Sequence, residues 1–148
     1  RKRPQVKLIL YGMEAEARML NINPGQLKVF RQGCFEEWVS ILLKLNIGLV
    51  SICGDYDLRL GSYDLIEFMI SKIPYIASEE PTFHKFSQYG QWVHNTAAEW
   101  ENAILNTVEY LDTHQKKSGS DPFLFALSQD LSANIAGILK IYEVIINQ

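Results

Sequence analysis

The chain has 148 residues, 47% of them hydrophobic and 21% charged, a composition that is typical of folded globular proteins and excludes a disordered chain. Its formal net charge of -3 gives no basic field that would hold nucleic acid. No apolar run approaches the roughly 18 residues that a membrane-spanning helix requires, so no transmembrane segment is expected. Because the chain begins with Arg1 instead of methionine, we expect it to be a piece of a longer protein.

Five short apolar runs are spaced along the first two-thirds of the chain, and each has the length of a β-strand. Continuous apolar runs at this spacing are typical of parallel strands that are covered on both faces. The buried strands are expected to include Ile9, Val29, Leu49, Ile76 and Val93. The runs are residues 6–12, 27–30, 47–53, 74–78 and 91–93.

Segments with helical spacing lie between and after these runs, at residues 14–20, 35–45, 62–72 and 97–117. A further helix is predicted to start at Asp121-Pro122 and to carry an apolar stripe that includes Leu127 and Ile135. The alternation predicts the α/β class, as a Rossmann-like open parallel sheet of about five strands that is flanked by helices and ends in helix. We expect residues 1–148 to form one such domain.

The loop GDYDLRLG (residues 54–61) follows one predicted strand and precedes a helix that should start at about Ser62. In open parallel sheets, ligands bind outside the carboxyl ends of the strands, where loops lead into helix starts. A helix start carries unpaired N–H groups and about half a positive charge, which suits a phosphate. Ser62 could cap this helix through its hydroxyl, and Gly61 would let a ligand approach the backbone closely.

Residues 54–78, GDYDLRLGSYDLIEFMISKIPYIAS, followed by residues 86–104, FSQYGQWVHNTAAEWENAI, resemble the carboxyl-terminal half of GT-B glycosyltransferases of the retaining group-1 type. In that family a loop leads into a helix with a donor-binding glutamate, then to a proline and a strand of the sense P-V-V-A-S. Glu67 matches the glutamate, and residues 73–78 match the proline and the strand. The resemblance covers most of the chain and is most specific over residues 55–104.

The resemblance implies a domain that binds a nucleotide diphosphate sugar, whose hexose is transferred to an acceptor hydroxyl. The active cleft of such enzymes lies between two domains, so the partner would be a missing amino-terminal domain, and this domain alone should not be an enzyme. No cofactor is expected, and no metal is strictly needed because the helix dipole and basic groups stabilise the leaving diphosphate. The substrate-binding residues would be Arg59, Gly61, Ser62, Tyr63 and Glu67, whereas the catalytic residues are not indicated.

Two charged positions depart from the family pattern. Arg59 stands where the family often has a second acid, and Asp64 stands where a related branch has a lysine that faces the diphosphate. Arg59 either binds phosphate or pairs with a neighbouring aspartate, and Asp64 either repels the diphosphate or simply stabilises its own helix. These reversals favour an alternative function, a degenerate GT-B domain that acts as a non-catalytic binding or scaffolding module. On that interpretation Glu67 is a solvated helix residue.

The remaining polar residues give weaker indications. Cys34 and Cys53 form no CxxC pair and have apolar neighbours in the sequence, which predicts buried thiols in a reducing, cytoplasmic compartment. The three histidines, His84, His94 and His114, lie ten and twenty residues apart and do not predict a metal site. The exposed aromatic residues that would face a missing domain are expected to be Tyr56 and Tyr63.

Overall fold

The computed structural model describes residues 5–52, 54, 62–113, 120–130, 132, 134–137 and 139–140. The chain divides into two compact units, residues 1–44 and residues 45–148, and each is described by itself. The predicted site residues Arg59 and Gly61, together with Cys53 and Tyr56, lie outside the described residues. No helix in the described part of the chain is long and apolar enough to cross a membrane.

The first unit contains a two-stranded parallel sheet, in which β1 pairs with β2 from Leu8 opposite Leu27 to Tyr11 opposite Phe30. The Gln26 side chain donates a hydrogen bond of 3.1 Å to the Val6 carbonyl, which links the strands just before the ladder begins. Its elements are β1 (Leu8–Tyr11), α1 (Glu14–Ala17), the 3₁₀ helix η1 (Pro24–Gln26), β2 (Leu27–Phe30) and α2 (Phe35–Leu42).

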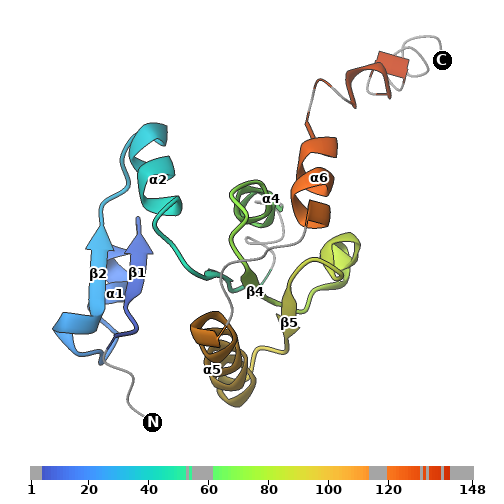
Figure 1. Ribbon diagram of the computed structural model, residues 1–148. Coiled ribbons are helices and arrows are strands. Elements are labelled where there is room, and N and C mark those ends of the chain that lie inside the picture. Colours follow the sequence, from blue (N-terminus) through green and yellow to red (C-terminus); the bar gives the residue numbers. More distant parts are fainter. Residues whose placement is uncertain are drawn as a thin grey trace. The chain divides into compact units, whose positions relative to one another are not determined.

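The second unit contains a three-stranded parallel sheet in the order β3-β4-β5, with β4 in the centre (Figure 1). All four residues of β4 are buried, as expected for a central strand whose two faces are both covered. The elements are β3 (Gly48–Val50), α4 (Tyr63–Ile70), β4 (Tyr75–Ser78), η2 (Pro81–Phe86), β5 (Gln91–Val93), α5 (Ala97–Thr113) and α6 (Ser120–Ser128).

Helices α4 and α5 cover opposite faces of this sheet (Figure 1). On one face, the fully buried Ile76 of β4 and Val93 of β5 pack with Ala103 of α5. On the other face, the Phe68 ring of α4 lies directly against the backbone of Gly48. Helices therefore cover both faces of this three-stranded parallel sheet, as in other α/β proteins.

Helix α4 ends in a motif that returns the chain to β4. Lys72 adopts a left-handed φ of 56°, its N–H donates to the Met69 carbonyl, and the Ile73 N–H donates to the Phe68 carbonyl at 2.8 Å. This is the Schellman pattern of hydrogen bonds, here with lysine where glycine is usual. Pro74 then prevents any continuation of the helix, so β4 starts at the next residue.

The α/β class and the positions of all five predicted strands are confirmed. Two burial predictions are wrong, because Val29 is 38% exposed and Leu49 is 42% exposed. Side chains alternate between the faces of a strand, so Val29 points away from the face that Lys28 and Phe30 share, and Leu49 points away from Phe68. Cys34 is exposed at the residue before α2, which also contradicts the prediction of a buried thiol.

Helix α6 differs from its prediction, because it ends at Ser128, before Ile135 of the predicted stripe, and because it buries another face. Leu127 and Ile135, two residues of the predicted stripe, are exposed, whereas Ala126 is buried. The Phe125 ring stacks on Tyr89 with 4.6 Å between centroids and meets Phe86 edge-on at 5.5 Å. These aromatic contacts stabilise the orientation of α6 in which Phe125 faces Tyr89 and Phe86.

The close approach of α4 to β3 generates a test of this packing. A methyl group on Gly48 would stand 2.6 Å from ring carbons of Phe68, a distance at which helix and strand must separate. Gly48→Ala should therefore lower the free energy of unfolding by about 1 to 3 kcal/mol, measured by denaturant titration. Gly137→Ala is the matched control, since nothing lies within 4 Å of that position, and it should not destabilise the protein. Equal effects of the two substitutions would contradict the packing.

Candidate functional site

The carboxyl ends of β3, β4 and β5 are joined by hydrogen bonds between side chains and backbone. The Ser78 hydroxyl, at the end of β4, accepts from the Ile52 N–H at 2.9 Å and donates to Asn95 Oδ1 at 2.6 Å. Asn95 Nδ2 donates in turn to the Ile52 carbonyl at 2.8 Å. We call Ile52, Ser78 and Asn95 the strand-end clamp, because they bind the three chain segments to one another beyond the last backbone pairs of the sheet.

The clamp is also tied to helix α5. Trp100 Nε1 donates to Asn95 Oδ1 at 3.3 Å, so that this oxygen accepts two hydrogen bonds. Ser78 is the one buried polar residue among those the structure describes, with 1% of its surface exposed. A buried hydroxyl costs free energy unless it is hydrogen-bonded, and here both its donor and its acceptor capacity are used. The clamp therefore holds this edge of the sheet rigidly.

Outside the clamp, the loops after β4 and β5 are linked by an exposed contact between a carboxylate and a histidine. Glu79 Oε2 lies 2.9 Å from His94 Nδ1, and the Glu79 N–H donates to the Val93 carbonyl at 2.7 Å. The His94 N–H donates to Glu99 Oε2 at 2.8 Å, while Thr96 Oγ1 accepts from the Glu99 N–H. The sequence Thr-Ala-Ala-Glu thus forms a variant of the capping box, in which the glutamate reaches two residues further back than usual.

Helix α4 begins at the same edge as the clamp. Because β3 and β4 are parallel, the helix that connects them must start where β3 ends. Ser62 precedes the helix, as predicted, but its hydroxyl makes no capping hydrogen bond, which corrects the prediction of a Ser62 cap. Tyr63 is 74% exposed, in agreement with the predicted exposed aromatic residue.

Two acidic residues follow in the first turns of α4. The residue Asp64 as a whole is exposed to solvent. The atoms around its carboxyl nevertheless desolvate that group, which raises its pKa. Glu67 lies one turn further along and is half-buried. Side chains three residues apart share one side of a helix, so a ligand that meets one of these carboxyls would be close to the other. The structure therefore brings together Ser62, Tyr63 and Glu67 of the predicted site residues.

The described residues at this edge have a negative charge balance. The segments 62–67, 79–80 and 94–99 contain neither lysine nor arginine, and His94 is their only basic group. A carboxylate about 4 Å from a phosphate costs about 1 kcal/mol in water and about 4 kcal/mol at an effective dielectric constant near 20. The described acidic residues at this edge would therefore repel an anion. Its acids are Asp64, Glu67, Glu79, Glu80 and Glu99.

The clamp residues were not singled out from the sequence. In the sequence Ser78 is only the last residue of a predicted strand, and the 16 residues between Ser78 and Asn95 contain no motif that indicates a contact between the two. A serine that ends a run of buried apolar residues is the one signal that could have identified it. In the described part of the chain, no three His, Cys, Asp or Glu side chains gather in a way that could hold a metal ion. No protein-family model matches the chain, and no curated protein is significantly similar to it.

Removal of the Ser78 hydroxyl tests whether the clamp holds the edge together. Ser78→Ala leaves the buried Ile52 N–H without its acceptor and should lower the free energy of unfolding by about 1 to 3 kcal/mol. The exposed Ser87→Ala is the control and should change that free energy by less than about 0.5 kcal/mol. Denaturant titration measures the free energy of unfolding of both variants. If Ser78→Ala is as stable as Ser87→Ala, the clamp does not contribute to the stability of the fold.

The raised pKa of Asp64 predicts a pH dependence with a definite sign. A carboxyl whose pKa is higher in the folded state than in the unfolded state disfavours folding once it ionises, so the cost appears as the pH rises above the ordinary aspartate value of 3.8. Asp64→Asn removes this cost. The variant should be more stable than the wild type at pH 7 and lose that advantage at acidic pH. A wild-type Asp64 that titrates below 3.8 in a carboxyl NMR titration would contradict the prediction.

Proposed function

We infer that the chain provides the donor-binding, Rossmann-like half of a GT-B glycosyltransferase. The observation that carries the proposal is the position of Glu67, which lies one turn inside a helix that starts at the clamped carboxyl edge of a parallel sheet. Ligands of open α/β sheets bind at such an edge. The resemblance of residues 55–104 to this family supports the same location.

In this proposal the ligand is a nucleotide diphosphate sugar. Glu67 accepts hydrogen bonds from the two ribose hydroxyls, for which an ionised carboxylate has enough lone pairs. The start of α4, with Gly61 and Ser62, faces the diphosphate through its N–H groups and its dipole, and Arg59 adds positive charge. Tyr63 borders the ligand from the exposed side. Transfer of the hexose to an acceptor hydroxyl would require the amino-terminal domain of the parent protein, so the isolated domain is not active.

A second function, a degenerate GT-B domain that serves as a non-catalytic binding or scaffolding module, is favoured by the acids at the same edge. Asp64, Glu79 and Glu80 would all stand near the phosphates, and the described residues there include no lysine or arginine to balance them. A domain that has lost its donor would keep the sheet and the clamp, because these stabilise the fold, and would lose the positive charge that served only the ligand.

Titration calorimetry of the isolated chain with UDP-, GDP- and ADP-glucose at low salt tests the donor proposal. Glu67→Gln replaces a charge-assisted hydrogen bond with a neutral one and should weaken the binding of the preferred nucleotide sugar by about 1 to 3 kcal/mol. Glu109→Gln, which removes an exposed carboxylate from the carboxyl-terminal part of α5, is the matched control and should leave the affinity unchanged.

Asp64→Lys separates the two functions. It exchanges repulsion for attraction, so a degraded donor site should bind the nucleotide sugar at least about tenfold more tightly, and the gain should fall as salt is added. Glu109→Lys is the control for the change in net charge. If neither the wild type nor Asp64→Lys binds any of the three nucleotide sugars, the donor proposal is wrong and the scaffolding module is the better account.

A further inference from the structure

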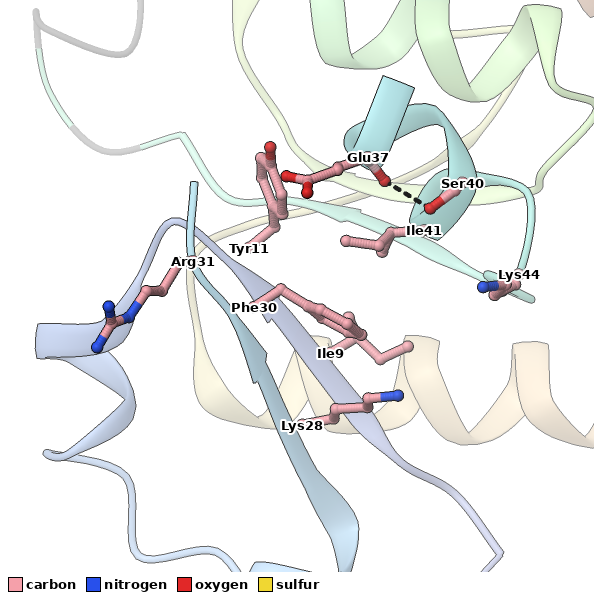
Figure 2. A pocket seen from close by; sticks show the side chains of 9 residues that line it. All are labelled: Ile9, Tyr11, Lys28, Phe30, Arg31, Glu37, Ser40, Ile41 and Lys44. Carbon is pink, nitrogen blue, oxygen red and sulfur yellow. Dashed lines mark hydrogen bonds between the residues drawn. The ribbon is translucent and has the colours of Figure 1, made fainter. Parts of the chain in front are cut away.

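The first unit contains an open pocket of about 410 Å³ between its two-stranded sheet and helix α2 (Figure 2). This volume is in the range of pockets that hold small organic molecules. All of the residues that line the pocket belong to the first unit, residues 1–44, whereas the donor proposal uses residues of the second unit. A ligand that binds here would therefore contact none of the residues on which the donor proposal rests.

The middle of the pocket is apolar. Figure 2 shows Ile9 of β1, Phe30 of β2 and Ile41 of α2 facing the same space. Ile9 and Phe30 are half-buried, so part of their surface is open to a ligand, whereas Ile41 is buried. A flat or branched hydrocarbon group that covered these side chains would remove apolar surface from water, which is the main source of affinity in such sites.

The two ends of the pocket differ in charge. Figure 2 shows the ammonium groups of Lys28 and Lys44 at one end, with Glu37 and Tyr11 at the other. The Lys28 ammonium lies 4.7 Å from the centroid of the Phe30 ring, so the cationic end adjoins the apolar middle. Among the described residues, neither lysine forms an ion pair with a carboxylate.

The opposite end carries the Glu37 carboxylate, and Figure 2 shows that Arg31, which also lines the pocket, extends its guanidinium away from Glu37 and Tyr11. The Glu37 carboxylate lies over Gly33, whose N–H donates at 2.8 Å to the Tyr11 hydroxyl, and Tyr11 in turn packs on Trp38 with 5.0 Å between ring centroids. These contacts fix the residues that border this end. A ligand with an anionic group at both ends would meet repulsion from Glu37, whereas one with a single anionic group could place it between the lysines.

We propose that this pocket binds a small organic anion that has an apolar body and one anionic group, a phosphate monoester or a carboxylate. The anionic group lies between Lys28 and Lys44, the body covers Ile9, Phe30 and Ile41, and the far end meets Glu37. The charge pattern of the pocket selects this class, because a neutral ligand would leave both ammonium groups unused and a doubly ended anion would be repelled.

Calorimetry with phenyl phosphate and with benzoate at low salt tests the proposal, and the tighter of the two identifies the anionic group. Lys28→Gln and Lys44→Gln should each weaken binding about fivefold or more, the effect of one unit charge at about 4 Å in water. Lys7→Gln is the matched control, since Lys7 is exposed in the same unit and does not border the pocket, and it should leave the affinity unchanged. Inorganic phosphate, which lacks the apolar body, and benzyl alcohol, which lacks the charge, should both bind much more weakly.

A probe with an anionic group at each end tests the orientation of the ligand. 4-Carboxyphenyl phosphate should bind more weakly than phenyl phosphate, and Glu37→Gln should reduce this difference because the repelling carboxylate is gone. Amide NMR shifts on addition of phenyl phosphate should gather at Ile9, Lys28, Phe30 and Ile41. The proposal is overturned if phenyl phosphate shows no saturable binding, if both lysine variants bind it as the wild type does, or if the shifts lie outside the pocket.

Discussion

The Ser78 hydroxyl is the constraint on which the carboxyl edge of the second unit depends. It is buried at the end of the central strand, and only its bonds to the Ile52 N–H and to Asn95 offset the cost of that burial. Through them, the segments after β3 and β5 are held to β4, and through Asn95 the start of α5 is held as well. A rigid edge of this kind can position loop residues precisely enough to recognise a ligand.

The geometry and the charge of this edge favour different functions. The start of α4 offers N–H groups and a dipole to an anion, whereas Asp64 and its acidic neighbours oppose one. Desolvation already raises the pKa of Asp64, so its ionised form is costly even without a ligand. A site that had to bind a diphosphate would gain from losing this acid. The presence of Asp64 at this edge therefore favours the scaffolding alternative.

The strands could be predicted from the sequence because each lies in a short run of mostly apolar residues, and residues 27–30 and 91–93 match β2 and β5 to the residue. Burial could not be predicted as well. Val29 and Leu49 are as apolar as Ile76, but which face of a strand is covered depends on helices that are distant in the sequence. The clamp was missed for the same reason, since Ile52 and Asn95 are 43 residues apart and meet only after β4 has been placed between them.

The most direct test of the central claim is an amide NMR map of the isolated chain during titration with the nucleotide sugar that it binds best. If the clamped edge is the donor site, the largest shifts will lie at the start of α4, from Tyr63 to Glu67, and in the loops after β4 and β5 at Glu79 and Asn95. Shifts that gather instead around Lys28 and Ile41 in the first unit, or no shifts at all, would contradict the claim.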